Sequence, residues 1–306
     1  MASVEQRAAG ISSRDPVRSG VLAGICANTV WGFLPLLFYL VDDVDPFEVV
    51  AVRTACSLLV VGMIVVVSRR FGEVVTTLRN PRVTLGLLCS AVLLAINWLM
   101  YVYAVQSNQV LEGSFGYFIN PMVSVGLGMV FLGERHSRSQ TAALGLALVA
   151  IVVQAVGIGG VPVISLVLAL SFGLYGFIRK IVKADATNGL AIETLLLTFP
   201  AVAYVGWSVA HAGLGPLGQP RDLLLLLATG PATATPLLLY AYSVRRLRLA
   251  TVGMLQYVAP SIQFVLAITF FGEQINLVRL ISFVLVWASL VIFTTDSFRQ
   301  QRRLRG

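Results

Sequence analysis

Long apolar segments alternate with short polar segments along almost the whole chain. Each apolar segment runs for 20 residues or more, and about 20 apolar residues are needed for a helix to cross the hydrocarbon core of a bilayer. Because backbone groups must bond to each other in lipid, such segments form helices. The pattern predicts an all-α integral membrane protein with ten transmembrane helices over residues 18–41, 46–68, 82–105, 111–132, 138–157, 161–181, 190–210, 221–244, 250–271 and 277–296.

The chain also contains an internal repeat. Residues 97–153 align without a gap with residues 236–292, at a constant offset of 139 that brings Pro121 onto Pro260. Each unit contains five predicted helices, and because five is odd, the second unit should enter the membrane in the opposite orientation. The expected organisation is a cytoplasmic tail over 1–17, inverted five-helix repeats over 18–157 and 161–296, and a basic cytoplasmic tail over 297–306.

The repeat is looser upstream of the gap-free match. Trp31-Gly32 lies 144 residues before Tyr175-Gly176, and Glu48 lies 145 residues before Glu193. The second of these alignments places Thr198 opposite Arg53, which predicts chemically different sites in the two units.

The distribution of charge gives the topology. Only 12% of residues are charged, about half the share of a soluble domain, and the net charge is +8. Of the 22 Lys and Arg residues, 19 fall on one side of the predicted helices, and Arg221 and Arg279 on the other, with Arg53 inside a span. This asymmetry follows the positive-inside rule and predicts a multi-pass protein of the cytoplasmic (inner) membrane with both termini cytoplasmic. The positive charge therefore indicates topology, and no nucleic-acid partner is expected.

The sequence offers no catalytic or cofactor motif. It has no H-E-x-x-H, no paired aspartates inside a span and no phosphate-binding glycine loop. Cys26, Cys56 and Cys89 all lie inside apolar runs, without the spacing of a metal site or a disulfide framework. Residues 1–17 are polar and do not resemble a cleavable signal. We therefore expect neither an enzyme nor a cofactor or metal.

Inverted repeats of this kind are typical of secondary transporters, which expose one midplane site to each side in turn. Several motifs carry a more specific resemblance, namely Trp31-Gly32, Asn97-Trp98, GYFINP at 116–121 followed by GMVFLGER at 128–135, and SFGLYGFIRK at 171–180. In these motifs the chain resembles the EamA-type permeases called RarD, of the drug/metabolite transporter superfamily. The resemblance implies an inner-membrane permease with a ten-helix fold and a link to chloramphenicol.

The predicted function is therefore secondary transport of a small organic metabolite or drug-like molecule, with a chloramphenicol-like compound as one candidate, by alternating access. The alternative is a channel or membrane sensor without coupled transport. Expected partners are the small-molecule substrate and membrane lipid, and the sequence leaves a homodimer open.

Arg53 is the most costly polar residue inside a predicted span, at about 2.5–3.5 kcal/mol near the bilayer centre. It lies at about the same depth as Glu112, which begins the fourth span from the same side. One interpretation is an Arg53–Glu112 pair that opens when an anionic substrate binds or Glu112 is protonated. The others are a static ion pair, or an Arg53 side chain that reaches the interface beside Glu48.

Other candidates come from polar and aromatic positions within the spans. Asn28 and Trp31 adjoin a glycine face of the first helix, which should serve close packing. Pro121 and Pro260 should interrupt hydrogen bonding at matching depths, as at transporter sites. The predicted substrate-binding residues are Asn28, Trp31, Arg53, Asn97, Tyr101, Glu112, Tyr117, Asn120, Tyr175, Tyr240, Gln256 and Gln263.

Three further glutamates are interpreted mainly as structural. Glu193 near the start of its span could stabilise a helix N-terminus or take part in proton or substrate binding. Gly133-Glu134 and Gly272-Glu273 read as helix ends, and Ser137-x-x-Gln140 resembles a capping box for the following helix.

Overall fold

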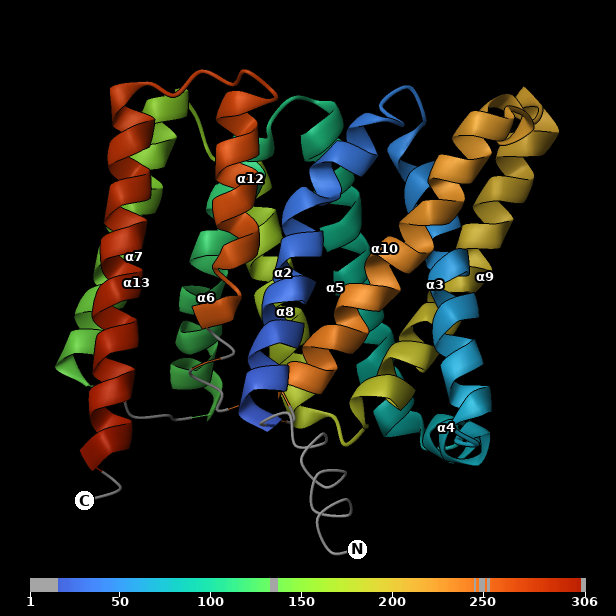
Figure 1. The fold of residues 1–306 in the computed structure, drawn as a ribbon, viewed down its shortest axis with the longest axis horizontal. Coiled ribbons are helices and arrows are strands. Elements are labelled where there is room, and N and C mark those ends of the chain that lie inside the picture. Colours follow the sequence, from blue (N-terminus) through green and yellow to red (C-terminus); the bar gives the residue numbers. More distant parts are fainter. Residues whose placement is uncertain (1–15, 133–136, 245, 248–250, 252–253, 304–306) are drawn as a thin grey trace, which may run out of the picture.

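The computed structural model describes residues 16–132, 137–244, 246–247, 251 and 254–303. Within these ranges the regular structure is entirely helical, and nine helices are long and apolar enough to cross a membrane. These nine correspond to nine of the ten predicted spans, and they are connected in chain order (Figure 1). They are α2 (Pro16–Tyr39), α3 (Pro46–Val67), α5 (Pro81–Gln106), α6 (Val110–Leu132), α7 (Arg138–Ile158), α8 (Val163–Ile181), α9 (Ala186–Ala212), α10 (Pro220–Val244) and α13 (Leu277–Arg303).

The remaining predicted span, 250–271, is not a single helix in the described residues. The apolar helix α12 covers only Val258–Thr269, and Gln256 and Tyr257 form a turn just before it. Pro260 is the third residue of α12, a position where the missing N–H costs no helical hydrogen bond. Its repeat partner Pro121 lies instead inside the continuous helix α6. Pro121 thus removes one helical hydrogen bond without ending its helix, whereas the break in the other copy lies just before Pro260, so the two copies differ.

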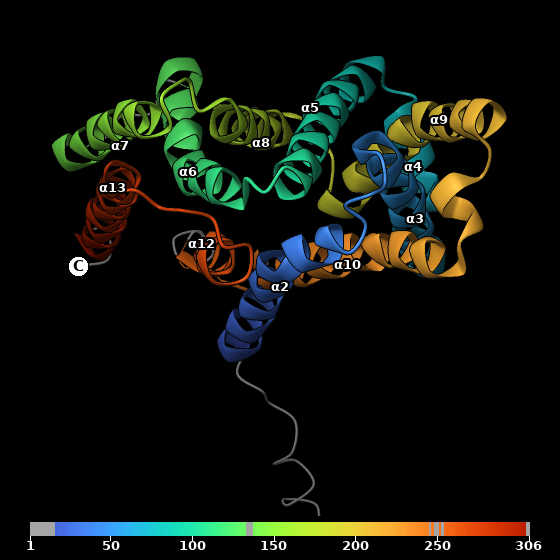
Figure 2. The ribbon, with the colours of Figure 1, turned by 90° about the horizontal axis from the view of Figure 1, so that it is seen from above.

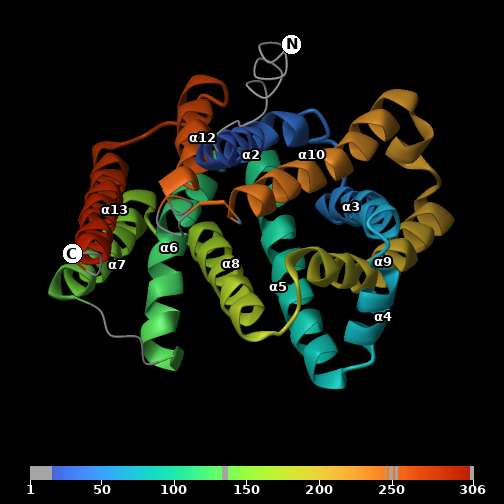
Figure 3. The same cartoon turned by 60° about the horizontal axis from the view of Figure 1, so that its bottom comes forward.

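Among the described residues, the short 3-10 helix η2 (Gly215–Gly218) connects α9 to α10, and one short α-helix lies outside the spans. The helix α4 (Phe71–Leu78) is near the end of the molecule where α2 starts and α13 finishes (Figures 1 and 3). Arg70, just before it, pairs with Glu73 at 2.7 Å and with Asp185 at 2.9 Å, and Asn188 donates to Glu73 at 2.8 Å. These contacts hold α4 against the first turn of α9, and the Arg70 guanidinium lowers the pKa of the Glu73 carboxyl.

Seen from above, most helices form two facing rows (Figure 2). One row contains α7, α6, α8 and α5, and the other contains α13, α12, α2 and α10, while α3 and α9 pack on each other at one end. Between the rows, α7 packs on α13 and α6 packs on α12. Phe115, Phe118 and Phe283 lie in the apolar core formed by these helices, whereas large side chains such as Leu59 and Met63 are exposed on the outside, as expected for contact with lipid.

Glycines allow close helix contact at two places. On α2, a Cβ added at Gly24 would lie 2.6 Å from Leu255, and one at Gly32 would lie 2.8 Å from Ile262. The predicted glycine face of the first helix is therefore a packing face, as small residues are in membrane helices.

The second close contact joins α6 to α8. A Cβ on Gly116 would lie 2.6 Å from the backbone oxygen of Ser165, and one on Gly173 would lie 2.7 Å from Val123. These glycines fix how near the two helices approach.

Candidate functional site

Arg53 is fully inside the helix bundle, with only 3% of its surface exposed. Its Nε donates a 2.6 Å hydrogen bond to Oγ1 of Thr233 on α10, and the Thr233 hydroxyl donates in turn to the carbonyl of Thr229 at 2.8 Å. The guanidinium carbon lies 4.4 Å from the ring centre of Trp98 and 5.3 Å from that of Phe38. The side chain is thus held by one hydroxyl and two aromatic rings.

The aromatic surroundings of Arg53 continue along α5 and α6. The Tyr101 ring lies 6.0 Å from that of Phe38 and 5.5 Å from that of Tyr117, measured between ring centres. The Tyr117 hydroxyl donates to Oδ1 of Asn97 at 3.1 Å. Asn97 in turn donates to the Leu168 carbonyl and to the Ser171 hydroxyl of α8, each at 3.1 Å.

The predicted pair of Arg53 and Glu112 does not form. Among the described residues, Arg53 makes no ion pair with a carboxylate. Glu112 interacts instead with Arg279 of α13, and its carbonyl accepts a 2.7 Å hydrogen bond from Ser165. Nor does Arg53 reach out to Glu48, since its side chain points to α5 and α10. The prediction considered only the depth of the two residues, and their side chains lie on helix faces with different neighbours.

A second buried charge lies at Glu193 of α9, whose surface is 0% exposed. Ser90 of α5 donates to Oε1 at 2.5 Å, Tyr175 of α8 donates to Oε2 at 3.5 Å, and Nε of Arg179 lies 3.6 Å from Oε1. This carboxylate therefore has a counter-ion and two hydroxyl donors. The expectation that Glu193 belongs to the first helical turn is wrong, because α9 begins at Ala186.

Four other candidates form a third cluster between α2, α10 and α12. The Trp31 ring lies 5.7 Å from that of Tyr240, whose hydroxyl accepts a 2.7 Å hydrogen bond from Gln256. Gln263 donates to the carbonyl of Trp31 at 3.2 Å.

Like Glu112, two further predicted residues stand apart from these clusters. Asn28 is buried but donates to the carbonyl of Gly24 in its own helix at 2.8 Å. The side-chain oxygen of Asn120 on α6 is buried and has no hydrogen-bond partner among the described residues.

Arg53 and Glu193 occupy equivalent places in their helices. An aspartate caps each helix, Asp45 through the N–H of Phe47 and Asp185 through that of Thr187. Counted from Pro46 and from Ala186, Arg53 and Glu193 are each the eighth residue. The threonine that follows each of them bonds back to the carbonyl four residues earlier. The correct offset here is 140, so Glu193, and not Thr198, corresponds to Arg53.

The second Gly-Glu pair caps a helix, as its structural interpretation expects. Gly272 has a φ of 65°, and both carboxylate oxygens of Glu273 accept from the N–H of Leu111 in the first turn of α6, at 3.1 and 3.2 Å. Burial raises the pKa of the Glu273 carboxyl to about 7, against the opposing effect of these bonds and of Arg279. Gly133-Glu134 lies outside the described residues. The predicted capping box of Ser137 and Gln140 is confirmed.

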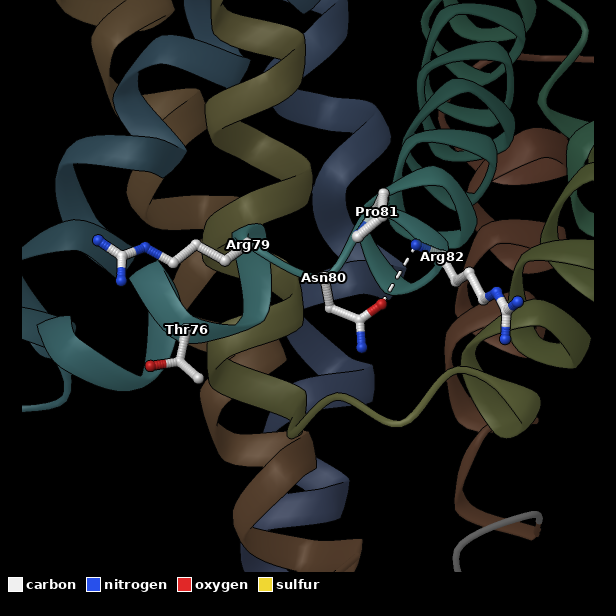
Figure 4. A pocket seen from close by; sticks show the side chains of 5 residues that line it. All are labelled: Thr76, Arg79, Asn80, Pro81 and Arg82. Carbon is white, nitrogen blue, oxygen red and sulfur yellow. Dashed lines mark hydrogen bonds between the residues drawn. The ribbon is translucent and has the colours of Figure 1, made fainter.

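A surface depression lies near α4, away from all these clusters. It has a volume of about 480 Å³ and is lined by Thr76, Arg79, Asn80, Pro81 and Arg82 (Figure 4). The side chains of Arg79 and Arg82 point away from each other, so they do not converge on a ligand (Figure 4). Within the described ranges, no group of His, Cys, Asp and Glu is arranged to hold a metal ion.

Sequence reasoning missed the partners of the two charges. Thr233, Ser90 and Arg179 are polar residues whose importance depends on which helix faces which, and nothing in their local sequence singles them out. Counting from the Asp185 cap would have found the correspondence of Glu193 with Arg53. Trp98 had been noted only as part of a motif.

In the part of the chain that the structure describes, the bundle is all-helical with nine apolar spans and buried polar clusters, which is consistent with a membrane protein. The profile of the EamA-like transporter family matches residues 18–155. The protein RarD of Streptomyces exfoliatus is 43% identical over 94% of this chain and 92% of its own, and that of Escherichia coli K12 is 38% identical over 94% and 97%. The chain belongs to the EamA family, and within it to the RarD-type permeases.

Two further comparisons add context. A Pseudomonas aeruginosa protein named chloramphenicol-sensitive protein RarD is 29% identical over 93% of this chain and 96% of its own. A solved crystal structure with 17% sequence identity superposes with a TM-score of 0.59, covering 92% of this chain and 98% of that one. At that identity the likeness shows a shared fold alone.

Proposed function

We propose that the protein is a secondary carrier of the cytoplasmic membrane, in which two inverted five-helix units move a small organic molecule by alternating access. The observation that carries this proposal is the placement of Arg53 and Glu193. They are the eighth residues of helices that pack together and run in opposite directions (Figure 1). At 1.5 Å per residue, each lies about 10 Å inside, measured from opposite ends of the bundle.

Helix packing supports the inverted relation. The starts of α5 and α10, Pro81 and Pro220, are 139 residues apart, as are those of α7 and α13, Arg138 and Leu277. Contacts are exchanged between the units: α2 packs on α10 and α12, and α8 packs on α5 and α6.

Individual contacts follow the same exchange. Gly32 of the first unit packs on Ile262 of the second, and Gly173 of the second unit packs on Val123 of the first. Val123 and Ile262 are 139 apart, and Gly32 and Gly173 are 141 apart. The pattern supports an offset of 141 for the first helices, in place of the 144 given by aligning Trp31-Gly32 with Tyr175-Gly176.

Such a design suits a carrier because the two inverted units can exchange conformations, which would open the site to one side of the membrane and then to the other. The buried clusters lie toward both ends, and α12 and the turn before it provide a non-continuous span beside them. The compounds to test as cargo come from two sources. Chloramphenicol is chosen because of the name of one relative. Small organic acids and aromatic amino acids are chosen because of the aromatic and charged clusters.

The test is counterflow in proteoliposomes that contain the purified full-length protein. A carrier will exchange an internal unlabelled compound for the same labelled compound outside, with saturation, and without a steady ionic current. Single-channel currents in the same preparation, or uptake that never saturates, would contradict the proposal. Arg221→Gln removes one positive charge at the exposed start of α10 and should leave this exchange unchanged.

A further inference from the structure

We propose that Arg53 is the binding site for the acidic group of the cargo, and that the cargo is a small organic anion with a flat apolar part. This inference rests on the proposed carrier function and names its substrate class. It starts from a contrast between two buried charges, Arg53 and Glu193, at equivalent positions of neighbouring helices.

The charge on Arg53 is incompletely satisfied by the protein. A guanidinium carries five N–H donors, and the one side-chain bond that the structure places on it uses Nε. Its Nη1 is buried without any acceptor in the described part of the chain, and no carboxylate there forms an ion pair with it. An isolated buried ion is strongly unfavourable unless it is paired.

Glu193 shows that this bundle can supply a counter-ion where one is needed. At the equivalent position in α9 it is met by Arg179, Ser90 and Tyr175. A charge that is balanced by the protein needs no ligand. We therefore assign the missing partner of Arg53 to a ligand, and a planar guanidinium pairs best with an oxyanion, either carboxylate or phosphate.

The surroundings of Arg53 also define the rest of the ligand. The Tyr101 hydroxyl is a second buried group without a hydrogen-bond partner among the described residues, and its ring packs edge-on against Phe38, the ring beside which the guanidinium lies. Two donors, from Arg53 and Tyr101, can thus face one oxyanion. The rings of Trp98, Phe38 and Tyr117 supply flat apolar surfaces beside them, which favour an aromatic or other planar body.

The bond from Arg53 to Thr233 orients this site. Because the Thr233 hydroxyl donates to the carbonyl of Thr229, its oxygen is left to accept from Nε of Arg53. That arrangement fixes the plane of the guanidinium between α5 and α10, with Nη1 free for a ligand. A neutral cargo would leave the charge as poorly compensated as before, and a cationic cargo would be repelled.

The test measures binding directly, by equilibrium dialysis and thermal unfolding of the detergent-solubilised full chain. The probes are benzoate and phenylphosphonate as anions, benzamide as the neutral isostere of benzoate, and benzylamine as a cation. We expect the anions to bind with dissociation constants of roughly 1 mM or tighter, typical of the Michaelis constants of biological substrates, and benzamide at least 10-fold more weakly. The two anions distinguish a carboxylate from a phosphate cargo.

Variants locate the site. Arg53→Gln should weaken benzoate binding about 10- to 100-fold, the loss expected for hydrogen bonds to a charged group, and Arg221→Gln should not change it. Arg53→Lys should bind benzoate with intermediate affinity, because lysine keeps the positive charge and lacks the planar array of N–H donors of the guanidinium. If Arg53→Gln does not fold, Tyr101→Phe removes one donor without a change of shape and should weaken binding several-fold.

Three results would overturn the inference: benzamide binding as tightly as benzoate, anion binding that is unchanged in Arg53→Gln, or no binding of either anion to the wild type. Counterflow separates the two proposals. Anion binding that depends on Arg53, without any exchange, would contradict the proposed carrier function and support the proposed anion site. Saturable exchange of neutral compounds that is indifferent to Arg53→Gln would keep the carrier and sink the site.

Discussion

Arg53 and Glu193 are the same position of two neighbouring antiparallel helices, yet the fold treats their charges in opposite ways. Glu193 is completely buried and has Arg179 and two hydroxyl groups as partners. Arg53 is almost as buried and has one hydroxyl and aromatic rings. Equivalent position therefore does not give equivalent chemistry: the paired charge of Glu193 links three helices, whereas Arg53, without a carboxylate partner among the described residues, is the charge that we propose to bind a ligand.

The largest effect should come from removing the counter-ion of Glu193. Arg179→Met leaves a buried carboxylate without its cation, and breaking a buried pair in this way costs about 3–5 kcal/mol in free energy of unfolding. The Arg179→Met/Glu193→Gln double variant should recover most of that loss. The measurement is chemical unfolding in mixed micelles, with Lys183→Met, at an exposed position, as control. A single variant as stable as the double would show that Glu193 does not depend on Arg179.

Arg53 should behave in the opposite way. Because Arg53→Met leaves no carboxylate unpaired and removes a costly cation from the bilayer, the free energy of unfolding should stay the same or rise by about 1 kcal/mol. Counterflow of an anionic cargo should nevertheless fall by about 10- to 100-fold. Stability and exchange are measured on the same preparations. A loss of stability as great as that of Arg179→Met would mean that Arg53 holds the bundle together.

The packing of α6 on α8 keeps Tyr117 near Arg53, and two glycines of α6 test it. A Cβ on Gly116 would meet the backbone oxygen of Ser165 at 2.6 Å, where no side chain can move aside, so Gly116→Ala should destabilise the protein by about 1–3 kcal/mol. Gly126 has nothing within 4 Å, and Gly126→Ala should be neutral or stabilising by up to about 1 kcal/mol. Equal unfolding free energies for both variants would contradict the close approach of these helices.

A further prediction, confined to pH dependence, concerns Glu273, a carboxylate that lies outside the spans. Its pKa in the folded protein is raised to about 7 from an ordinary 4.5 by burial, with Glu112 adding to the effect and Arg279 and the Leu111 backbone opposing it. A raised carboxyl pKa means that the folded state binds the proton more tightly than the unfolded state. Its contribution to stability is therefore present below about pH 4.5 and is lost as the pH rises through about 7.

The melting temperature should accordingly fall between these pH values in the wild type, and the slope should be smaller in Glu273→Gln. The matched control is Asp43→Asn, in the exposed loop before α3. A slope that Glu273→Gln leaves unchanged would assign the pH dependence to another group.

Apolar runs alone predicted nine of the spans to within a few residues, because a bilayer requires long unbroken helices whatever their neighbours are. The same reasoning failed at 250–271, where the turn at Gln256 and Tyr257 precedes α12. Hydropathy depends only on which residues a segment contains, so an apolar segment has the same hydropathy whether or not its helix is interrupted.

The candidate residues were predictable as individuals and not as partners. Polar side chains inside spans stand out in a sequence, so Arg53, Asn97 and Tyr101 could be selected by composition. Whether Arg53 meets Glu112 or Thr233 depends on the rotation of each helix about its axis, and a uniformly apolar helix carries little record of that rotation. The register of the repeat was likewise set by contacts, such as the Asp45 and Asp185 caps. The sequence by itself determined the class, nine of the spans and the presence of a repeat, since these depend on local hydrophobicity and spacing. Only the tertiary structure decided which buried charge has a counter-ion, because that depends on the sides of distant helices that face each other.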